Sequence, residues 1–181
     1  YVPEIPIDDG AYFRLYLRLQ DGFSTGTTNQ VKLIAMRGAV DVENTYGGGK
    51  NRTRTNHFSA DLCIDSSRSL HFYYYHSDQL GGWGDITYCK LSFFKYTKIS
   101  PGKWYCIELM LKNNTPSQKN GQLSAWLDGK LIGNVERLRF RDTEEAKIRR
   151  LAVYNYFGGN NRWQTSPKDQ RIYVDNLVIS R

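Results

Sequence analysis

The sequence predicts an all-β protein, an antiparallel β-sandwich of the jelly-roll type with lyase-like or concanavalin-like architecture. Apolar and polar residues alternate with a period of two in several short segments. Stretches rich in Gly, Asn, Ser and Asp separate these segments, as in all-β folds whose strands are joined by turns. The length of 181 residues suits one compact domain. We therefore expect a single domain over residues 1–181.

The first half of the chain supplies four expected strands. Residues 12–19 alternate strictly, with Phe, Leu, Leu and Leu on one face, and residues 57–64 alternate in the same way. Residues 31–36 form a short apolar run, and residues 70–76 are mostly aromatic. Residues 37–56 are polar, contain three consecutive glycines, and are expected to form a long loop.

The second half repeats this pattern after a long connection. Residues 78–102 contain the run Gly81-Gly82-Trp83-Gly84, close at Pro101-Gly102, and are expected to be a second long segment. The pair Asp128-Gly129, flanked by apolar residues, is a strong hairpin signal. Residues 142–150 begin like a capped helix but are short, so a short helix and a turn both remain open. The other expected strands are 104–112, 148–156 and 171–179.

Composition narrows the class of partner without choosing one. Aromatic residues make up 14% of the chain, the net charge is +7 and the pI is near 9.3, which favours nucleic acid, an anionic glycan or a membrane surface as partner. No apolar run approaches the roughly 18 residues of a membrane span. No nucleic-acid recognition motif occurs, and the basic residues are spread along the chain. We therefore expect neither nucleic acid nor a membrane as partner.

Polar and aromatic residues that alternate with the apolar ones are the candidates for a binding site. Aromatic rings stack on sugars, and Lys and Arg pair with carboxylates, so such a face suits an acidic glycan. The same pattern also fits core packing of the aromatic residues and a solvated basic surface, and these alternatives stay open. The candidates are Arg14, Tyr16, Arg18, Lys32, Arg37, His57, Ser59, Asp61, His71, Tyr73 and Tyr75.

Other chemistries fit the sequence less well. It contains no H-E-x-x-H, no phosphate-binding Walker loop and no G-x-S-x-G. A metal pair of His71 and His76 would need opposite faces of one strand, so no metal site is expected there. Asp61 and Glu108 are an alternative carboxylate pair for a glycosidase, which needs two opposed carboxylates.

Several segments together resemble the polysaccharide lyases of the family 14 type, which include alginate and glucuronate lyases. Their order and approximate spacing run over nearly the whole chain, and most of them are turns, strand ends and core aromatics. The similar segments are AYFRLYLR at 11–18, KL at 32–33, FSA at 58–60, YYYHSDQ at 73–79, PGKW at 101–104, NG at 120–121, WLDG at 126–129, FGG at 157–159 and YVDN at 173–176.

The resemblance implies a jelly roll that cleaves a uronate polymer by β-elimination. A positive or amide group neutralises the carboxylate, a Tyr or Lys removes the C5 proton, and a Tyr protonates the leaving oxygen. By position, Lys32 resembles the strand lysine of the family, Tyr73 and Tyr75 its tyrosine pair, and Ser59 its serine. Two residues after that serine the family tends to carry an arginine, whereas this chain has Asp61.

Asp61 is the main objection to catalysis, because a carboxylate there would repel a uronate. Arg37, Arg14 and His57 are the candidates to supply the missing positive charge. The catalytic set expected from the resemblance is therefore Tyr73, Tyr75, Lys32 and His57, with the other candidates binding substrate.

The leading hypothesis is a lyase acting on an acidic, uronate-containing polysaccharide. The alternative is a non-catalytic carbohydrate-binding module on the same fold, and a structural or adhesive domain is a third reading. We expect no required cofactor, although a structural calcium near Asp175 is a weaker expectation. We also expect an extracellular, secreted, monomeric domain that is one module of a larger protein.

Overall fold

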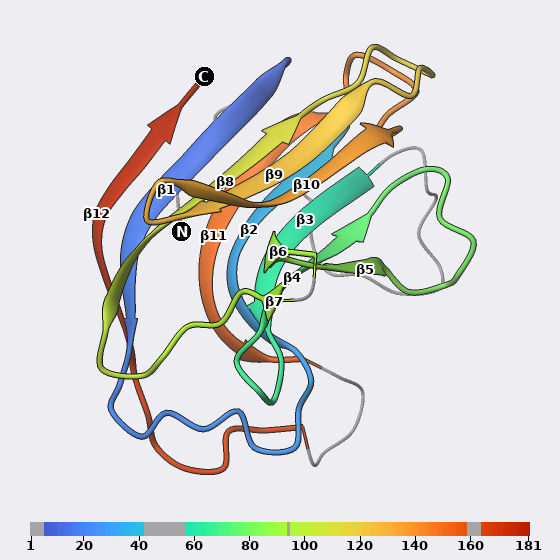
Figure 1. The fold of residues 1–181 in the computed structure, drawn as a ribbon. Coiled ribbons are helices and arrows are strands. Elements are labelled where there is room, and N and C mark those ends of the chain that lie inside the picture. Colours follow the sequence, from blue (N-terminus) through green and yellow to red (C-terminus); the bar gives the residue numbers. More distant parts are fainter. Residues whose placement is uncertain (1–5, 42–56, 94, 159–163) are drawn as a thin grey trace.

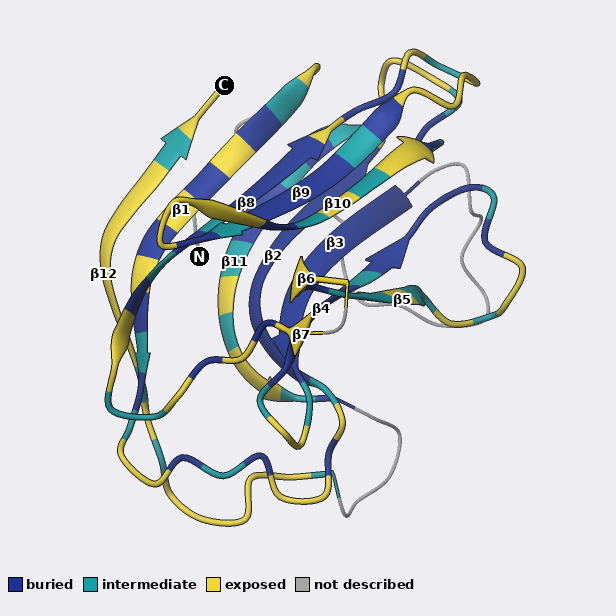
Figure 2. Ribbon diagram, in the orientation of Figure 1, coloured by how far each residue is buried: buried dark blue, intermediate teal, exposed yellow. Residues whose placement is uncertain are grey.

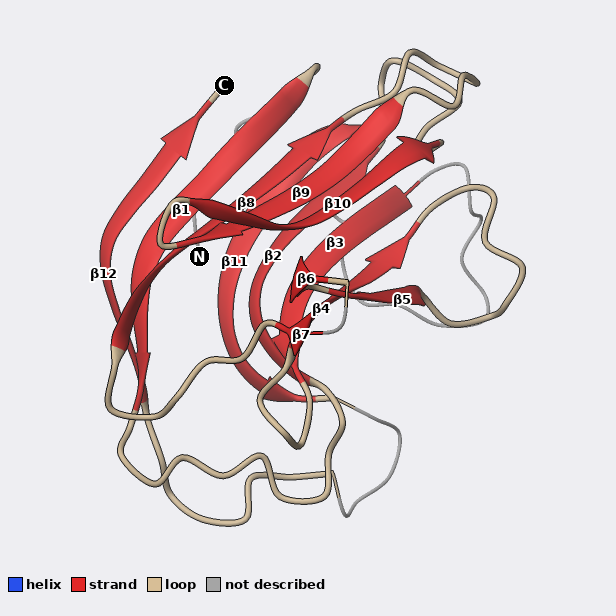
Figure 3. Ribbon diagram, in the orientation of Figure 1, coloured by secondary structure: helices blue, strands red, loops and turns tan. Residues whose placement is uncertain are grey.

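Strands and loops make up the whole of the part of the chain that the structure describes. This structure is a computed structural model, and it describes residues 6–41, 57–93, 95–158 and 164–181. Within these ranges the elements are all strands (Figure 3), and no helix is long and apolar enough to cross a membrane. The three consecutive glycines expected in a loop at 47–49 lie outside the described residues.

One layer of the molecule, named here the back sheet, has the strand order β10-β9-β8-β1-β12. All its strand pairs are antiparallel, and β1 lies between β8 and β12, two strands that are far from it in the sequence. Its strands are β1 (Gly10–Leu19), β8 (Trp104–Lys112), β9 (Gly121–Leu127), β10 (Lys130–Leu138) and β12 (Ile172–Ser180).

The second layer, named here the site sheet, has the order β11-β2-β3-β4-β5 and is also antiparallel. Its strands are β2 (Val31–Ala39), β3 (His57–Ile64), β4 (Leu70–Tyr75), β5 (Asp85–Tyr88) and β11 (Lys147–Phe157). The strands β6 (Lys90–Ser92) and β7 (Lys95–Tyr96) follow β5 in the sequence and form a separate two-stranded sheet. The two curved layers face each other (Figure 1), which confirms the expected antiparallel sandwich of the jelly-roll type.

The core between the layers is built from the apolar face of each strand. In β1 the side chains of Phe13, Leu15 and Leu17 are fully buried, while Tyr12 and Tyr16 on the other face are exposed. This alternation is visible along the ribbon in Figure 2. Burying each of these large apolar side chains stabilises the fold by about 1.5–3 kcal/mol. A shift of the pairing by one residue would expose all of them to solvent, so their burial fixes the register of the strand.

Strands β2 and β3 differ because both of their faces are buried (Figure 2). In β3 the residues Phe58, Ala60 and Leu62 pack in the core, while Ser59 and Asp61 on the opposite face are also buried. The term site face is used here for this outer face of the site sheet. Polar side chains that lose water on this face need partners within the protein.

Three expectations about local structure were incomplete or wrong. Residues 142–145 form bends and turns and β11 begins at Lys147, so of the short helix and the turn that were left open there, the structure has the turn. The connection expected over 78–102 contains β5, β6 and β7, and the loop expected from residue 37 begins after Ala39. The strands β5, β6 and β7 are short, and pairing with neighbouring strands determines their conformation more than the local sequence pattern does.

Candidate functional site

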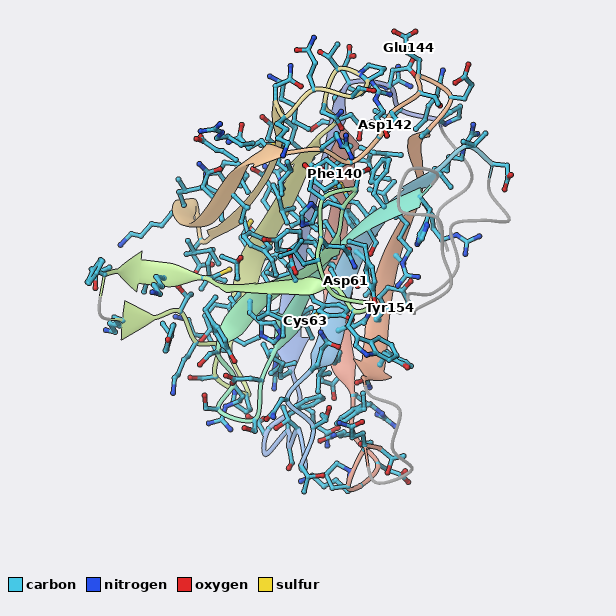
Figure 4. All side chains as sticks on the ribbon, turned by 90° about the vertical axis from the view of Figure 1, so that its right-hand side faces the viewer. Asp61, Cys63, Phe140, Asp142, Glu144 and Tyr154 are labelled. Atoms are coloured by element: carbon cyan, nitrogen blue, oxygen red, sulfur yellow. The ribbon has the colours of Figure 1, made fainter. Side chains whose placement is uncertain are left out.

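The site face gathers polar side chains from three neighbouring strands. In the register of the sheet, Asp61 of β3 lies opposite Ala35 of β2 and Tyr73 of β4. Ser59 in turn lies opposite Tyr75 on β4. Because alternate residues of a strand share a face, Ser59, Asp61, Tyr73 and Tyr75 project on the same side. Figure 4 shows Asp61 near the middle of this face.

A β-bulge brings both cations of β2 to the site face. Lys32 and Arg37 are five residues apart, so strict alternation would place them on opposite faces. The pairing of β2 with β3 shifts between Lys32 and Ile34, and both Leu33 and Ile34 are buried in the core. The bulge thus adds one residue and restores the common face.

Asp61 binds both of these cations. The Lys32 ammonium donates to one carboxylate oxygen of Asp61 at 2.7 Å, and the Arg37 guanidinium donates to the other at 3.4 Å. The side chain of Asp61 is 0% exposed, and those of Lys32 and Arg37 are each 11% exposed. The cluster therefore combines two positive charges with one negative charge in a nearly dry position.

The tyrosine pair lies beside this cluster on β4. The hydroxyl groups of Tyr73 and Tyr75 share a hydrogen bond of 2.8 Å, and the Gly84 backbone N–H donates to the Tyr73 hydroxyl at 3.1 Å. The Lys32 ammonium lies 5.0 Å from the centre of the Tyr73 ring. Burial, followed by the hydrogen bond to Tyr75, raises the pKa of Tyr73 well above its ordinary value. Tyr73 is accordingly a protonated phenol that can donate a proton.

The two histidine candidates lie at opposite ends of the site face. The His57 ring is 6.4 Å from the Tyr75 ring, so His57 belongs to the tyrosine end. His71 lies opposite Cys63 and Tyr88, and its ring is 5.2 Å from that of Tyr88. Burial lowers the pKa of His71 below its ordinary value, so it is uncharged at neutral pH and is a poor partner for a carboxylate.

The structure separates Arg14, Tyr16 and Arg18 from the other candidates. They lie on β1 of the back sheet, between β8 and β12, on the face turned away from the core. The expected neighbourhood with Lys32 is therefore wrong. Arg18 binds the exposed Asp21 at 3.2 Å instead. Sequence alternation assigned the correct face of the strand but could not assign the sheet, because sheet membership depends on pairing between distant segments.

Two aromatic residues of the site face were missed. The Arg37 guanidinium lies 5.4 Å from the Tyr154 ring, and the Lys32 ammonium lies 6.0 Å from the Tyr156 ring. Both tyrosines are on β11, the strand that pairs with β2, and Figure 4 shows Tyr154 close to Asp61. The alternation of residues over the expected strand 148–156 places both tyrosines on one face, and this was the signal in the sequence that could have identified them. Tyr156 is 50% exposed and offers a ring to a ligand at the border of the site.

The other chemistries considered find no support in the geometry. Asp61 and Glu108 lie on different sheets, so they cannot form the opposed carboxylate pair of a glycosidase. His76 binds Asp85 at 2.8 Å, away from His71. Within the described ranges no group of three His, Cys, Asp or Glu could hold a metal ion. Asp175, near which calcium was expected, accepts a hydrogen bond from the backbone N–H of Asn176.

Solved structures of several other proteins have a similar fold over nearly the whole chain. A variant of alginate lyase Aly36B in complex with an alginate trisaccharide is 21% identical, with a TM-score of 0.79 over 97% of this chain and 72% of the other. The PL-14 alginate lyase of Aplysia kurodai is 18% identical, with a TM-score of 0.76 over 97% and 71%. The endo-β-1,4-glucuronan lyase of Trichoderma reesei is 14% identical, with a TM-score of 0.60 over 97% and 69%. At these identities the similarity concerns the fold.

The sequence itself provides the assignment to a family. Comparison with curated protein sequences yields no significant match. The family model described as polysaccharide lyase 14, however, matches residues 23–177, which include every strand of the site sheet. The chain therefore belongs to the polysaccharide lyase 14 family.

Proposed function

We propose that this protein is a polysaccharide lyase that cleaves a uronate-containing polysaccharide, alginate or glucuronan, by β-elimination. The observation that carries the proposal is the hydrogen-bonded pair of Tyr73 and Tyr75 next to the cluster of Lys32, Arg37 and Asp61. The polymers are suggested by the similar structures, which are named alginate lyases and a glucuronan lyase.

The charge of the cluster suits a uronate. Lys32 and Arg37 together exceed the charge of Asp61 by one positive charge. A substrate carboxylate that enters this site offsets this excess positive charge, and its negative charge is partly withdrawn from the sugar ring. Such electrostatic neutralisation acidifies the proton on the adjacent C5 and stabilises the charge that develops there.

The tyrosine pair supplies a route for the proton. Tyr75 takes the C5 proton, its own proton passes along the 2.8 Å hydrogen bond to Tyr73, and Tyr73 gives its proton to the leaving O4. The electron pair of the C5–H bond forms the C4–C5 double bond, and the C4–O4 bond breaks with its electrons on O4. Protons and electrons balance without a cofactor. The raised pKa of Tyr73 keeps this phenol protonated for its role as the acid.

The remaining candidates take supporting roles in the proposal. His57 lies beside Tyr75, and Ser59 lies between Arg37 and Tyr75 in the register of the sheet, so both border the position of the reacting sugar. His71 contributes to packing at the far end of the site face. We further propose that the protein is secreted and acts as a monomeric module of a larger protein, where polymeric substrates are accessible.

The ultraviolet absorbance of unsaturated uronate tests the proposal. The protein is incubated separately with alginate, glucuronan and a neutral β-1,4-mannan, and the absorbance is followed with time. We expect it to rise with at least one of the two acidic polymers and to stay constant with mannan. Retained binding in affinity gels without any rise on either acidic polymer would instead indicate a carbohydrate-binding module.

A further inference from the structure

Among the described residues, the site face carries three buried cations: Lys32, Arg37 and, opposite Arg37 in the register of the sheet, Arg150 of β11. Lys32 and Arg37 contact Asp61 at different distances. The Lys32 ammonium lies 2.7 Å from Asp61, within the usual range of a charge-assisted hydrogen bond, whereas the Arg37 guanidinium lies at 3.4 Å, beyond that range. Both contacts end on the same fully buried carboxylate. The hydrogen bond of Lys32 to Asp61 is therefore the shorter and stronger of these two contacts.

Arg37 also has the more suitable chemistry and surroundings. A guanidinium is a planar fork with five donors, so one of its edges can hold Asp61 while another binds a second carboxylate in bidentate geometry. The ammonium of Lys32 is a point charge that lacks this geometry. Arg37 lies in register with Ser59, which in turn lies opposite Tyr75, so the guanidinium and the proton-accepting phenol belong to the same row of the sheet.

We propose that Arg37, carried by β2, is the group that binds and neutralises the uronate carboxylate, and that Asp61 is a positioning residue that orients Arg37 and holds Lys32. This inference rests on the proposed function for the identity of the ligand. It resolves the objection raised by a carboxylate at position 61. Asp61 does not face the substrate as an unpaired negative charge, because its two oxygens are each bound to a cation.

The competing cations are placed less well. Arg150 lies on β11, one strand further than Arg37 from the tyrosine pair of β4. Arg14 lies on the outer face of the back sheet, on the opposite side of the core. Lys32 is bound to Asp61 at 2.7 Å and lies near the rings of Tyr73 at 5.0 Å and Tyr156 at 6.0 Å, so moving it would disturb three contacts. The Arg37 guanidinium lies 5.4 Å from the centre of the Tyr154 ring, within the range of a cation–π contact.

Binding of matched charged and neutral oligosaccharides tests this inference. Two pairs of probes are used. Mannuronate tetrasaccharide is compared with β-1,4-mannotetraose, and glucuronate tetrasaccharide is compared with cellotetraose. The neutral member of each pair carries a hydroxymethyl group where the uronate carries a carboxylate. Calorimetry is done in the Tyr73→Phe/Tyr75→Phe background, so that turnover does not consume the ligand. Arg37→Gln is expected to weaken uronate binding by about tenfold or more, since a hydrogen bond to a charged group is lost, and to leave neutral binding unchanged. Arg14→Ala is the matched control and is expected to change neither.

The sign of the effect at Asp61 separates positioning from repulsion. In the same background, Asp61→Asn is expected to weaken uronate binding without changing neutral binding, and Asp61→Glu is expected to recover part of the loss. Tighter uronate binding by Asp61→Asn would mean that Asp61 repels the substrate. Fold is checked by circular dichroism, and Arg37→Lys replaces Arg37→Gln if the latter does not fold; we expect Lys to restore charge but not full affinity.

Each outcome bears on a different claim. If the unmodified protein forms unsaturated product and the folded Arg37 variant keeps its preference for uronate over neutral probes, the role of Arg37 is overturned and the lyase proposal is kept. Loss of uronate preference on replacing Arg37, in a protein that produces no unsaturated product, would overturn the lyase proposal and keep Arg37 as the carboxylate-binding residue. Absence of binding to both uronate probes by the background protein would overturn both.

Discussion

Replacing Asp61 by Asn should destabilise the protein more than any other single charge removal on the site face. Asn has nearly the same volume, so packing is conserved and only the negative charge is lost. Lys32 and Arg37 then face each other as like charges with side chains that are 11% exposed, too little for water to screen them well.

The distances set the size of this effect. At an effective dielectric of about 20, unit charges 2.7 Å apart attract by about 6 kcal/mol before desolvation is counted. Desolvation offsets much of this, and breaking a buried pair by removing one partner costs about 3–5 kcal/mol. Asn still accepts one hydrogen bond from Lys32, so we expect a loss of about 2–3 kcal/mol and a decrease of roughly 5–10 °C in Tm.

Urea unfolding measures the effect, and a surface pair provides the control. Asp21 binds Arg18 at 3.2 Å, but its side chain is 77% exposed, so Asp21→Asn should change the free energy of unfolding by no more than about 0.5 kcal/mol. The double variant Lys32→Met/Asp61→Asn should lose less than the two single losses added together, because the pair is coupled. A loss below about 0.5 kcal/mol for Asp61→Asn, equal to that of the control, would refute the reasoning.

Three further predictions follow from the same face. Tyr73→Phe and Tyr75→Phe should each lower kcat by about 10²–10⁴-fold, measured as unsaturated product; full activity in both would exclude the proton route. In Gly84→Ala a new Cβ would lie 2.8 Å from the Tyr74 carbonyl oxygen, so the N–H bound to Tyr73 should shift and kcat should fall at least about tenfold; unchanged kinetics would show that this donor has no role. Burial holds the pKa of His71 below 6.5, so the unfolded chain binds the proton more readily and stability should fall as pH drops below about 6.5; an equal slope of the urea midpoint against pH in His71→Gln would contradict this.

The fold could be predicted from local pattern because most strands have one face in the core. In β1, every second residue from Phe13 to Leu17 is fully buried, and that burial is what period-two alternation records. The same reasoning could not determine the partners of a strand. Tyr16 of β1 lies opposite Cys106 on one side and Asp175 on the other, and no local signal encodes such distant pairing.

The residues of the site were predicted better than the contacts between them. Alternation and the family resemblance together pointed to Tyr73, Tyr75 and Lys32, which the sheet brings together. The bulge after Lys32, which turns Arg37 to the same face, has no clear signature in the sequence. The sequence therefore displays Asp61 as a repulsive carboxylate, whereas the structure pairs it with two cations.

The mass of the new chain end tests the central claim most directly. Products from alginate and from glucuronan are separated and weighed by mass spectrometry after digestion by the unmodified protein and by Tyr73→Phe/Tyr75→Phe. At each cut, β-elimination predicts that the fragment with the new non-reducing end is lighter by one water than the corresponding hydrolysis product, while the other fragment has the ordinary mass. The lighter fragments are expected from the unmodified protein and not from the double variant. Cleavage that yields products of the full hydrolysis mass alone, or equal amounts of unsaturated product from both proteins, would contradict elimination by this tyrosine pair.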